Sequence, residues 1–133
     1  MTKDLKTRAD DLARGLRDLH KALIHAEAGD DPAYENPYTL LFAVIGNPRF
    51  SWLESLSQLI VLIDEARTDK EGALTEAVLR DAVASAKRLI GEGEDHDAQF
   101  RLRHLMAVQN APDVAIKTGK LRSILSELDR ASQ

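Results

Sequence analysis

Few residues of this chain have types and spacings that could support chemistry, and the histidines are the first to consider. His20 and His25 are five positions apart, so on a helix they diverge by about 140° and cannot share one face. Neither Glu-x-x-His nor His-Glu-x-x-His occurs, so the helical di-iron and zincin signatures are absent. A metal site built from Asp64, Glu65 and His20, His25 or His104 would depend on the fold bringing them together. We assign no metal ligand and no cofactor.

Two carboxylates at the end of an apolar segment are the best candidates for acid–base chemistry. The stretch "IVLIDEART" places Asp64 and Glu65 there. A buried Asp64 with a raised pKa would be a candidate general acid or base. The alternative is a surface carboxylate that pairs with Arg67 or with a basic residue of the first helix. The sequence has no Walker spacing and no Gly-x-Ser-x-Gly elbow, so no catalytic residue is assigned.

Five of the six aromatic residues lie within nineteen positions, from Tyr34 to Trp52. Such a cluster forms either a packed core corner or a groove for a protein or a small ligand, since Tyr and Trp are favoured at interfaces. Both interpretations stay open. The residues assigned to a binding surface are Tyr34, Tyr38, Phe50 and Trp52.

Composition indicates a single globular domain over residues 1–133. The apolar fraction is 44% and the charged fraction 30%, with no cysteine, so disulfides and thiolate chemistry are excluded. The net charge of −4 is unevenly distributed: residues 25–97 carry fifteen acidic and six basic groups, whereas residues 98–133 carry three acidic and six basic groups. The basic side chains of the C-terminal third are too sparse to predict a nucleic-acid surface.

Apolar spacing predicts helices almost throughout, and no strand. The expected helices span about residues 2–28, 37–45, 48–67, 75–90 and 97–110, and a last helix restarts at Pro112 and carries apolar positions as far as Leu128; we expect Asp95 or Asp97 to cap the fifth. They predict an all-α fold, an antiparallel bundle of four long helices plus one or two short ones. Gly15 in the first helix looks like a defect that costs about 1 kcal/mol relative to Ala.

Heptad spacing is strictest in the first and the last helix. Apolar residues recur at alternating intervals of four and three from Leu5 to Ala26 and from Val114 to Leu128. These seams either pair within one chain or continue between two chains. The residues assigned to an oligomer seam are Leu16, Leu121 and Leu125.

The third helix contains five consecutive apolar residues, Leu59 to Ile63. A membrane span needs about 20, and Arg49 and Glu54 interrupt the apolar character well before that. We therefore expect this helix to be the most buried one of the bundle.

Three segments resemble a group of small, uncharacterised bacterial helical proteins. They are the heptad-like first helix, "NPRFSWLESLSQLIVLIDE" and "NAPDVAIKTGKLRSIL". The shared features are a Pro-x-Phe-x-Trp-Leu turn at Pro48–Leu53 and a following Leu-Ser-x-Leu-Ile at Leu56–Ile60. The resemblance implies a bacterial, cytoplasmic, all-helical protein and attaches no activity to it.

Together these features favour a non-enzymatic interaction module whose partner is a second copy or another protein. A helical sensor or enzyme that binds a small ligand or metal at the aromatic cluster and Asp64/Glu65 is the first alternative. A nucleic-acid-associated regulator that uses the last two helices is the second. The N-terminus has no apolar region typical of a secretory signal, so the expected location is the cytoplasm, with no membrane partner.

Overall fold

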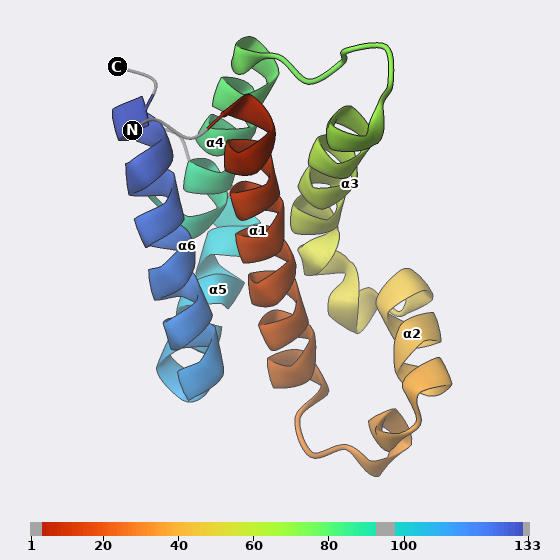
Figure 1. Ribbon diagram of the computed structural model, residues 1–133. Helices are drawn as coiled ribbons and strands as arrows, with labels where there is room; N and C mark the ends of the chain where they lie inside the picture. The colour runs from red at the N-terminus through yellow and green to blue at the C-terminus, as the bar shows by residue number, and fades with distance from the viewer. Residues whose placement is uncertain (1–3, 93–97, 132–133) are drawn as a thin grey trace.

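The computed structural model describes residues 4–92 and 98–131 (Figure 1), and helices dominate both ranges. The elements in chain order are α1 (Leu5–Ala28), the 3₁₀ helix η1 (Pro32–Glu35), α2 (Pro37–Gly46), the 3₁₀ helix η2 (Pro48–Leu53), α3 (Glu54–Thr68), α4 (Glu76–Ile90), α5 (Ala98–Asn110) and α6 (Pro112–Ala131). No strand occurs in these ranges, so the all-α prediction is confirmed. The finer prediction of an antiparallel bundle with four long helices is not established, because five described helices have 13 or more residues.

α1 is the central helix of the molecule. It contacts α3, α4, α5, α6 and η2, and its heptad positions from Ala9 to Leu23 are buried. The prediction that the third helix would be the most buried is therefore wrong. Val61 and Leu62 of α3 are 53% and 52% exposed, because α3 contacts α1, α4 and η2 but is open to solvent on its remaining side.

The two heptad seams meet inside one chain. α1 and α6 run side by side in opposite directions (Figure 1). Leu16, Leu121 and Leu125 are 0–1% exposed, so these side chains are not available to a second copy. Gly15 lies at the same contact, where a Cβ would be 2.8 Å from Cδ1 of Ile124. This glycine is therefore a point of close helix approach rather than a defect.

Both ends of α4 are fixed by local chemistry. The Thr75 hydroxyl accepts a hydrogen bond from the Val78 amide at 3.1 Å and so caps the N-terminus of the helix. Gly91 ends the helix in the left-handed conformation with φ 79°, and the Arg101 side chain packs against it. The predicted caps of α5, Asp95 and Asp97, lie outside the described residues.

α3 places the apolar run Leu59–Ile63 across both the core and the surface. Ile63 is fully buried, Leu59 is nearly so, and Val61 and Leu62 face solvent. None of the helices formed by residues 4–92 and 98–131 is long and apolar enough to cross a membrane.

Candidate interaction surface

α2 is a short, separately capped helix. The Asn36 side chain accepts hydrogen bonds from the amides of Tyr38 at 2.9 Å and Thr39 at 3.4 Å, and Pro37 occupies the first helical turn. Asn47 repeats this arrangement for η2, where its side chain accepts from the Arg49 amide at 2.9 Å. The two Asn-Pro pairs therefore fix where α2 begins and where the chain turns after it.

One side of α2 is an apolar surface open to solvent. Tyr38, Phe42 and Ile45 are 70–74% exposed, and Leu41 is 52% exposed. We call these four residues the α2 face; their spacing of i, i+3, i+4, i+7 places them on one side of the helix. No residue of α2 is buried, although Leu40, Ala43 and Val44 pack partly against the core from the other side. In Figure 1, α2 lies at the edge of the molecule beside η2.

The structure divides the predicted aromatic binding surface between core and surface. Phe50 and Trp52 point inward from η2 and are 1% and 9% exposed. Tyr34 is half-buried against Phe50 in an edge-to-face pair with ring centroids 5.6 Å apart, and Trp52 packs on Phe100 at 5.3 Å. Of the four assigned residues, only Tyr38 is largely exposed.

Trp52 also forms a wall of a surface cavity of about 180 Å³ between α1, η2 and α5. Leu23, Ala26 and Met106 contribute apolar atoms to this cavity, and Arg103 and Glu27 contribute charged groups of opposite sign. Within the described residues, the indole Nε1 of Trp52 is the one buried side-chain nitrogen or oxygen without a hydrogen-bond partner. We call this space the Trp52 cavity.

A second exposed apolar surface lies on α5, next to the Trp52 cavity. Leu102, Leu105 and Met106 are 62%, 39% and 49% exposed, and we call them the α5 face. Arg101 and Arg103 flank it, and α5 contains no acidic residue. The sequence analysis missed this surface. The sequence does contain the pattern that marks it, since Leu102, Leu105 and Met106 stand at i, i+3 and i+4. A second apolar stripe of the same helix, which includes Phe100, makes the contact with the core.

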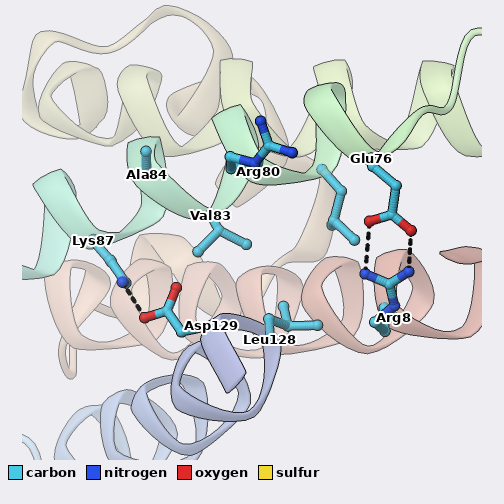
Figure 2. Close-up of a pocket in the computed structure, with 9 residues that line it drawn as sticks. Arg8, Glu76, Arg80, Val83, Ala84, Lys87, Leu128 and Asp129 are labelled. Carbon is cyan, nitrogen blue, oxygen red and sulfur yellow. Dashed lines mark hydrogen bonds and ion pairs between the residues drawn. The ribbon is translucent and has the colours of Figure 1, made fainter. Parts of the chain in front are cut away.

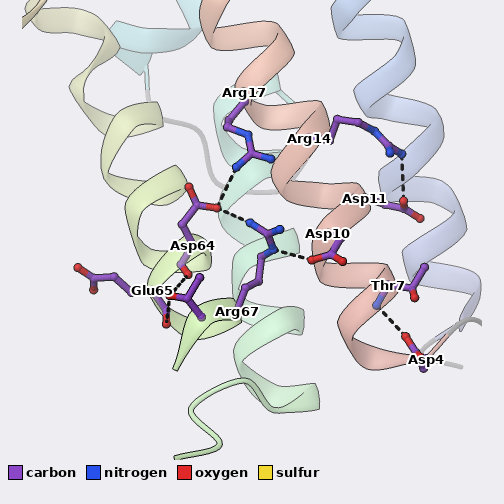
Figure 3. A network of polar contacts seen from close by, with 10 residues as sticks. Asp4, Thr7, Asp10, Asp11, Arg14, Arg17, Asp64, Glu65 and Arg67 are labelled. Atoms are coloured by element: carbon purple, nitrogen blue, oxygen red, sulfur yellow. Dashed lines mark hydrogen bonds and ion pairs between the residues drawn. The ribbon is translucent and has the colours of Figure 1, made fainter. Parts of the chain in front are cut away.

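Asp64 is held in a network of ion pairs between α1 and α3 (Figure 3). Its Oδ1 accepts from Arg67 at 2.6 Å and from Arg17 at 3.3 Å, and Arg67 also donates to Asp10 at 2.8 Å. Hydrogen bonds to Asp10 and Asp64 raise the pKa of Arg67. This matches the alternative in which Asp64 pairs with Arg67 and with a basic residue of the first helix, and it leaves Asp64 ion-paired rather than poised as an acid or base.

The three histidines in the described part of the chain, His20, His25 and His104, do not gather into a metal site. His20 bonds the Ser57 hydroxyl at 2.9 Å, and burial lowers the pKa of its imidazole. His104 is fully buried on α5, and burial, with Arg101 and Arg122 contributing, lowers its pKa to about 4. No group of three His, Asp or Glu side chains in residues 4–92 and 98–131 is placed to hold a metal ion.

A groove between α1, α4 and α6 has a volume of about 240 Å³ (Figure 2). Two ion pairs close it, Arg8–Glu76 near the start of α4 and Lys87–Asp129 near its end. The apolar floor includes Val83 and Leu128. These four charged groups are paired with one another across the helix junction, and Arg80 also lines the groove.

The basic side chains of the last two helices are partly occupied by contacts within the chain. Arg101 donates to His104, and Arg122 pairs with Glu92 at 3.3 Å. Lys120 is exposed on α6, and Lys117 is half-buried.

Comparison of the chain with protein-family models, with curated proteins and with solved structures finds no match. The function must therefore be argued from the surfaces described above.

Proposed function

We propose that this protein is a non-enzymatic interaction module, in which a helical bundle presents the α2 face to a second copy of the chain. The observation that supports the proposal is the exposure of the α2 face, with three large apolar side chains at 70–74% on one short helix. A contiguous apolar patch of this kind is comparable with the largest patch on a typical monomer, and such patches are often functional interaction sites.

The sequence around α2 supports a surface that becomes covered. Thirteen consecutive residues, 36–48, carry no charge, although 30% of the whole chain is charged. A helix that exposes apolar side chains to water normally carries charged residues among them, and α2 has none. Burial of this area against another apolar surface would contribute a favourable free energy of about 25 cal/mol for each Å² removed from water.

The charges that flank α2 favour a protein partner over a membrane or a nucleic acid. Residues 27–54 carry five acidic side chains and one basic side chain, Arg49. Arg49 lies near Glu27 and Asp31, so its charge is balanced locally. Helices that lie on membranes are usually rich in Lys and Arg, and nucleic acids also require a basic surface. The acidic residues around α2 oppose binding to a membrane and binding to a nucleic acid.

Light scattering after size-exclusion chromatography, over a hundredfold range of protein concentration, tests the proposal. We expect the wild-type chain to associate. Phe42→Glu should shift it to monomer, because a charge at the centre of the α2 face opposes burial. Helical circular dichroism should be unchanged, since Phe42 has little packing to lose.

The matched control is Ile116→Glu, which places the same charge at a 55% exposed apolar residue of α6. We expect this variant to associate as the wild type does. A wild-type chain that stays monomeric at every concentration contradicts the proposal, and so does association that Phe42→Glu leaves unchanged.

A further inference from the structure

We propose that the α2 face of one copy docks on the α5 face of a second copy, and that the exchange is reciprocal, so that two such contacts form one two-fold dimer. This inference depends on the proposed function and specifies which surface of the partner is used. In a two-fold dimer, a residue on one surface contacts a second surface of the partner, and the converse contact follows by symmetry.

Charge complementarity is the first argument for α5 as the docking surface. The α2 face lies in a segment, residues 27–54, with an acidic excess, whereas α5 has two arginines and no acidic residue. The other exposed apolar residues form no comparable surface: Ile116 of α6 has basic neighbours in Lys117 and Lys120 but is a single exposed apolar side chain. On α3, Val61 and Leu62 share their helix with Glu54, Asp64 and Glu65, which would repel the surroundings of α2.

Interface area is the second argument. The four side chains of the α2 face expose on the order of 500 Å², because a large aromatic side chain contributes about 150–250 Å² when free. Stable interfaces bury about 800 Å² on each partner. A contact between two α2 faces would fall short of this area. Reciprocal contacts use both the α2 face and the α5 face of each copy and come close to it.

Shape is the third argument. The α2 face is a protruding surface, since α2 lies at the edge of the molecule (Figure 1) and Tyr38 and Phe42 are 73% and 70% exposed. The α5 face adjoins the Trp52 cavity, and Met106 belongs to both. A cavity of about 180 Å³ is large enough for one aromatic side chain, and buried aromatic anchors in such cavities dominate many interfaces. We therefore expect Phe42 or Tyr38 of the partner to occupy the Trp52 cavity.

The test compares the α2 variant Phe42→Glu with the α5 variant Leu102→Glu, both at exposed positions. We expect each variant to raise the dissociation constant of the dimer at least tenfold. An equimolar mixture of the two should form a 1:1 complex at high concentration, because the intact α5 face of the first variant can still receive the intact α2 face of the second. Ile116→Glu again serves as the control.

Trp52 fluorescence gives a second readout, since Trp52 is the chain's single tryptophan and lines the cavity. Dilution of the wild type through its dissociation range should shift the emission, and dilution of Leu102→Glu should not. If the wild type associates and Phe42→Glu abolishes association while Leu102→Glu leaves it intact, the α5 docking is overturned and the proposed function stands. If the wild type is monomeric throughout, both fail.

Discussion

The imidazole Nε2 of His104 lies 2.9 Å from the hydroxyl oxygen of Thr118, and this pair joins α5 to α6 inside the core. Both side chains are at most 2% exposed. Because an arginine only donates hydrogen bonds, the contact from Arg101 to Nδ1 at 3.1 Å makes Nδ1 an acceptor. Nε2 is therefore the protonated ring nitrogen, and its N–H donates a hydrogen bond to the Thr118 hydroxyl. With a single ring proton, His104 is neutral in the folded protein.

This geometry predicts that mild acid destabilises the fold. The pKa of His104 is about 4 in the folded chain and about 6.5 when unfolded, so between these values the unfolded chain binds the extra proton. The contribution of neutral, buried His104 to the free energy of unfolding is complete above pH 6.5 and is lost as the pH falls toward 4. We expect the free energy of unfolding to fall by about 2 kcal/mol from pH 7 to pH 5 through this residue. Urea unfolding at the two pH values measures it.

His104→Gln provides the comparison for this prediction, because glutamine does not titrate. The variant will be less stable than the wild type at pH 7, but its stability should change less between pH 7 and pH 5. An equal pH dependence in both proteins would show that other groups cause it.

Two ion pairs on α1 should differ in their effect on stability. Arg8 is 7% exposed and donates two hydrogen bonds to Glu76 of α4, one of them at 2.9 Å. Its pKa is raised by that contact. Glu76→Ala leaves the arginine charge without this partner, and we expect a decrease in melting temperature several times larger than for Arg14→Ala. The Arg14–Asp11 pair is a surface pair, with Arg14 65% exposed. Similar decreases for the two variants would argue against the prediction.

Alanine should stabilise the protein at one helical glycine, Gly119, and should not at another, Gly15. A Cβ at Gly119 of α6 meets nothing within 4 Å, so Gly119→Ala should stabilise the protein by about 0.5–1 kcal/mol through helix propensity. At Gly15 the new Cβ would lie 2.8 Å from Ile124 and 3.2 Å from Leu121, which should cancel that gain. Gly15→Val should destabilise by about 1–3 kcal/mol. Chemical denaturation of the three variants measures these differences, and an equal gain at both glycines would show that α6 moves away freely.

Neutralising Asp64 should weaken the contact between α1 and α3 without other consequences. Asp64→Asn removes the charge that Arg17 and Arg67 share, while Arg67 keeps Asp10. We expect a loss of about 0.5–1 kcal/mol in the free energy of unfolding, in the upper range of surface ion pairs. Glu65→Gln, at the next position, is the control and should change stability by less than about 0.5 kcal/mol. A gain in stability for Asp64→Asn would contradict the prediction, because it would mean that desolvation of the carboxylate costs more free energy than its ion pairs with Arg17 and Arg67 contribute.

Helix positions were predictable from the sequence because caps and breakers are local. Asn36-Pro37 and Thr75 mark helix starts, and the predicted ends of α1 and α4, at Ala28 and Ile90, agree with the structure. Burial was less predictable. The five apolar residues of α3 looked central, but a helix buries only the sides on which neighbours lie, and the spacing of one helix does not tell how many neighbours it has.

Features that depend on distant residues were not visible in the sequence. The partner of Arg8 is 68 positions away, and the division of the aromatic cluster depends on η2 turning Phe50 and Trp52 inward while α2 turns Tyr38 outward. The predictions of self-association, of a small-ligand or nucleic-acid function, of a bacterial source and of a cytoplasmic location stay predictions.

The pairing of the first helix with the last also constrains how the chain folds during synthesis. Gly15 and Ile124 meet across roughly a hundred positions, which a ribosome adds in about ten seconds at the usual rates of elongation. During that interval the heptad seam of α1 has no α6 to cover it. We expect the nascent chain to expose this seam to chaperones, and the final folding step to wait for the C-terminal helix. A chain that ends before α6 would keep the seam exposed and should aggregate.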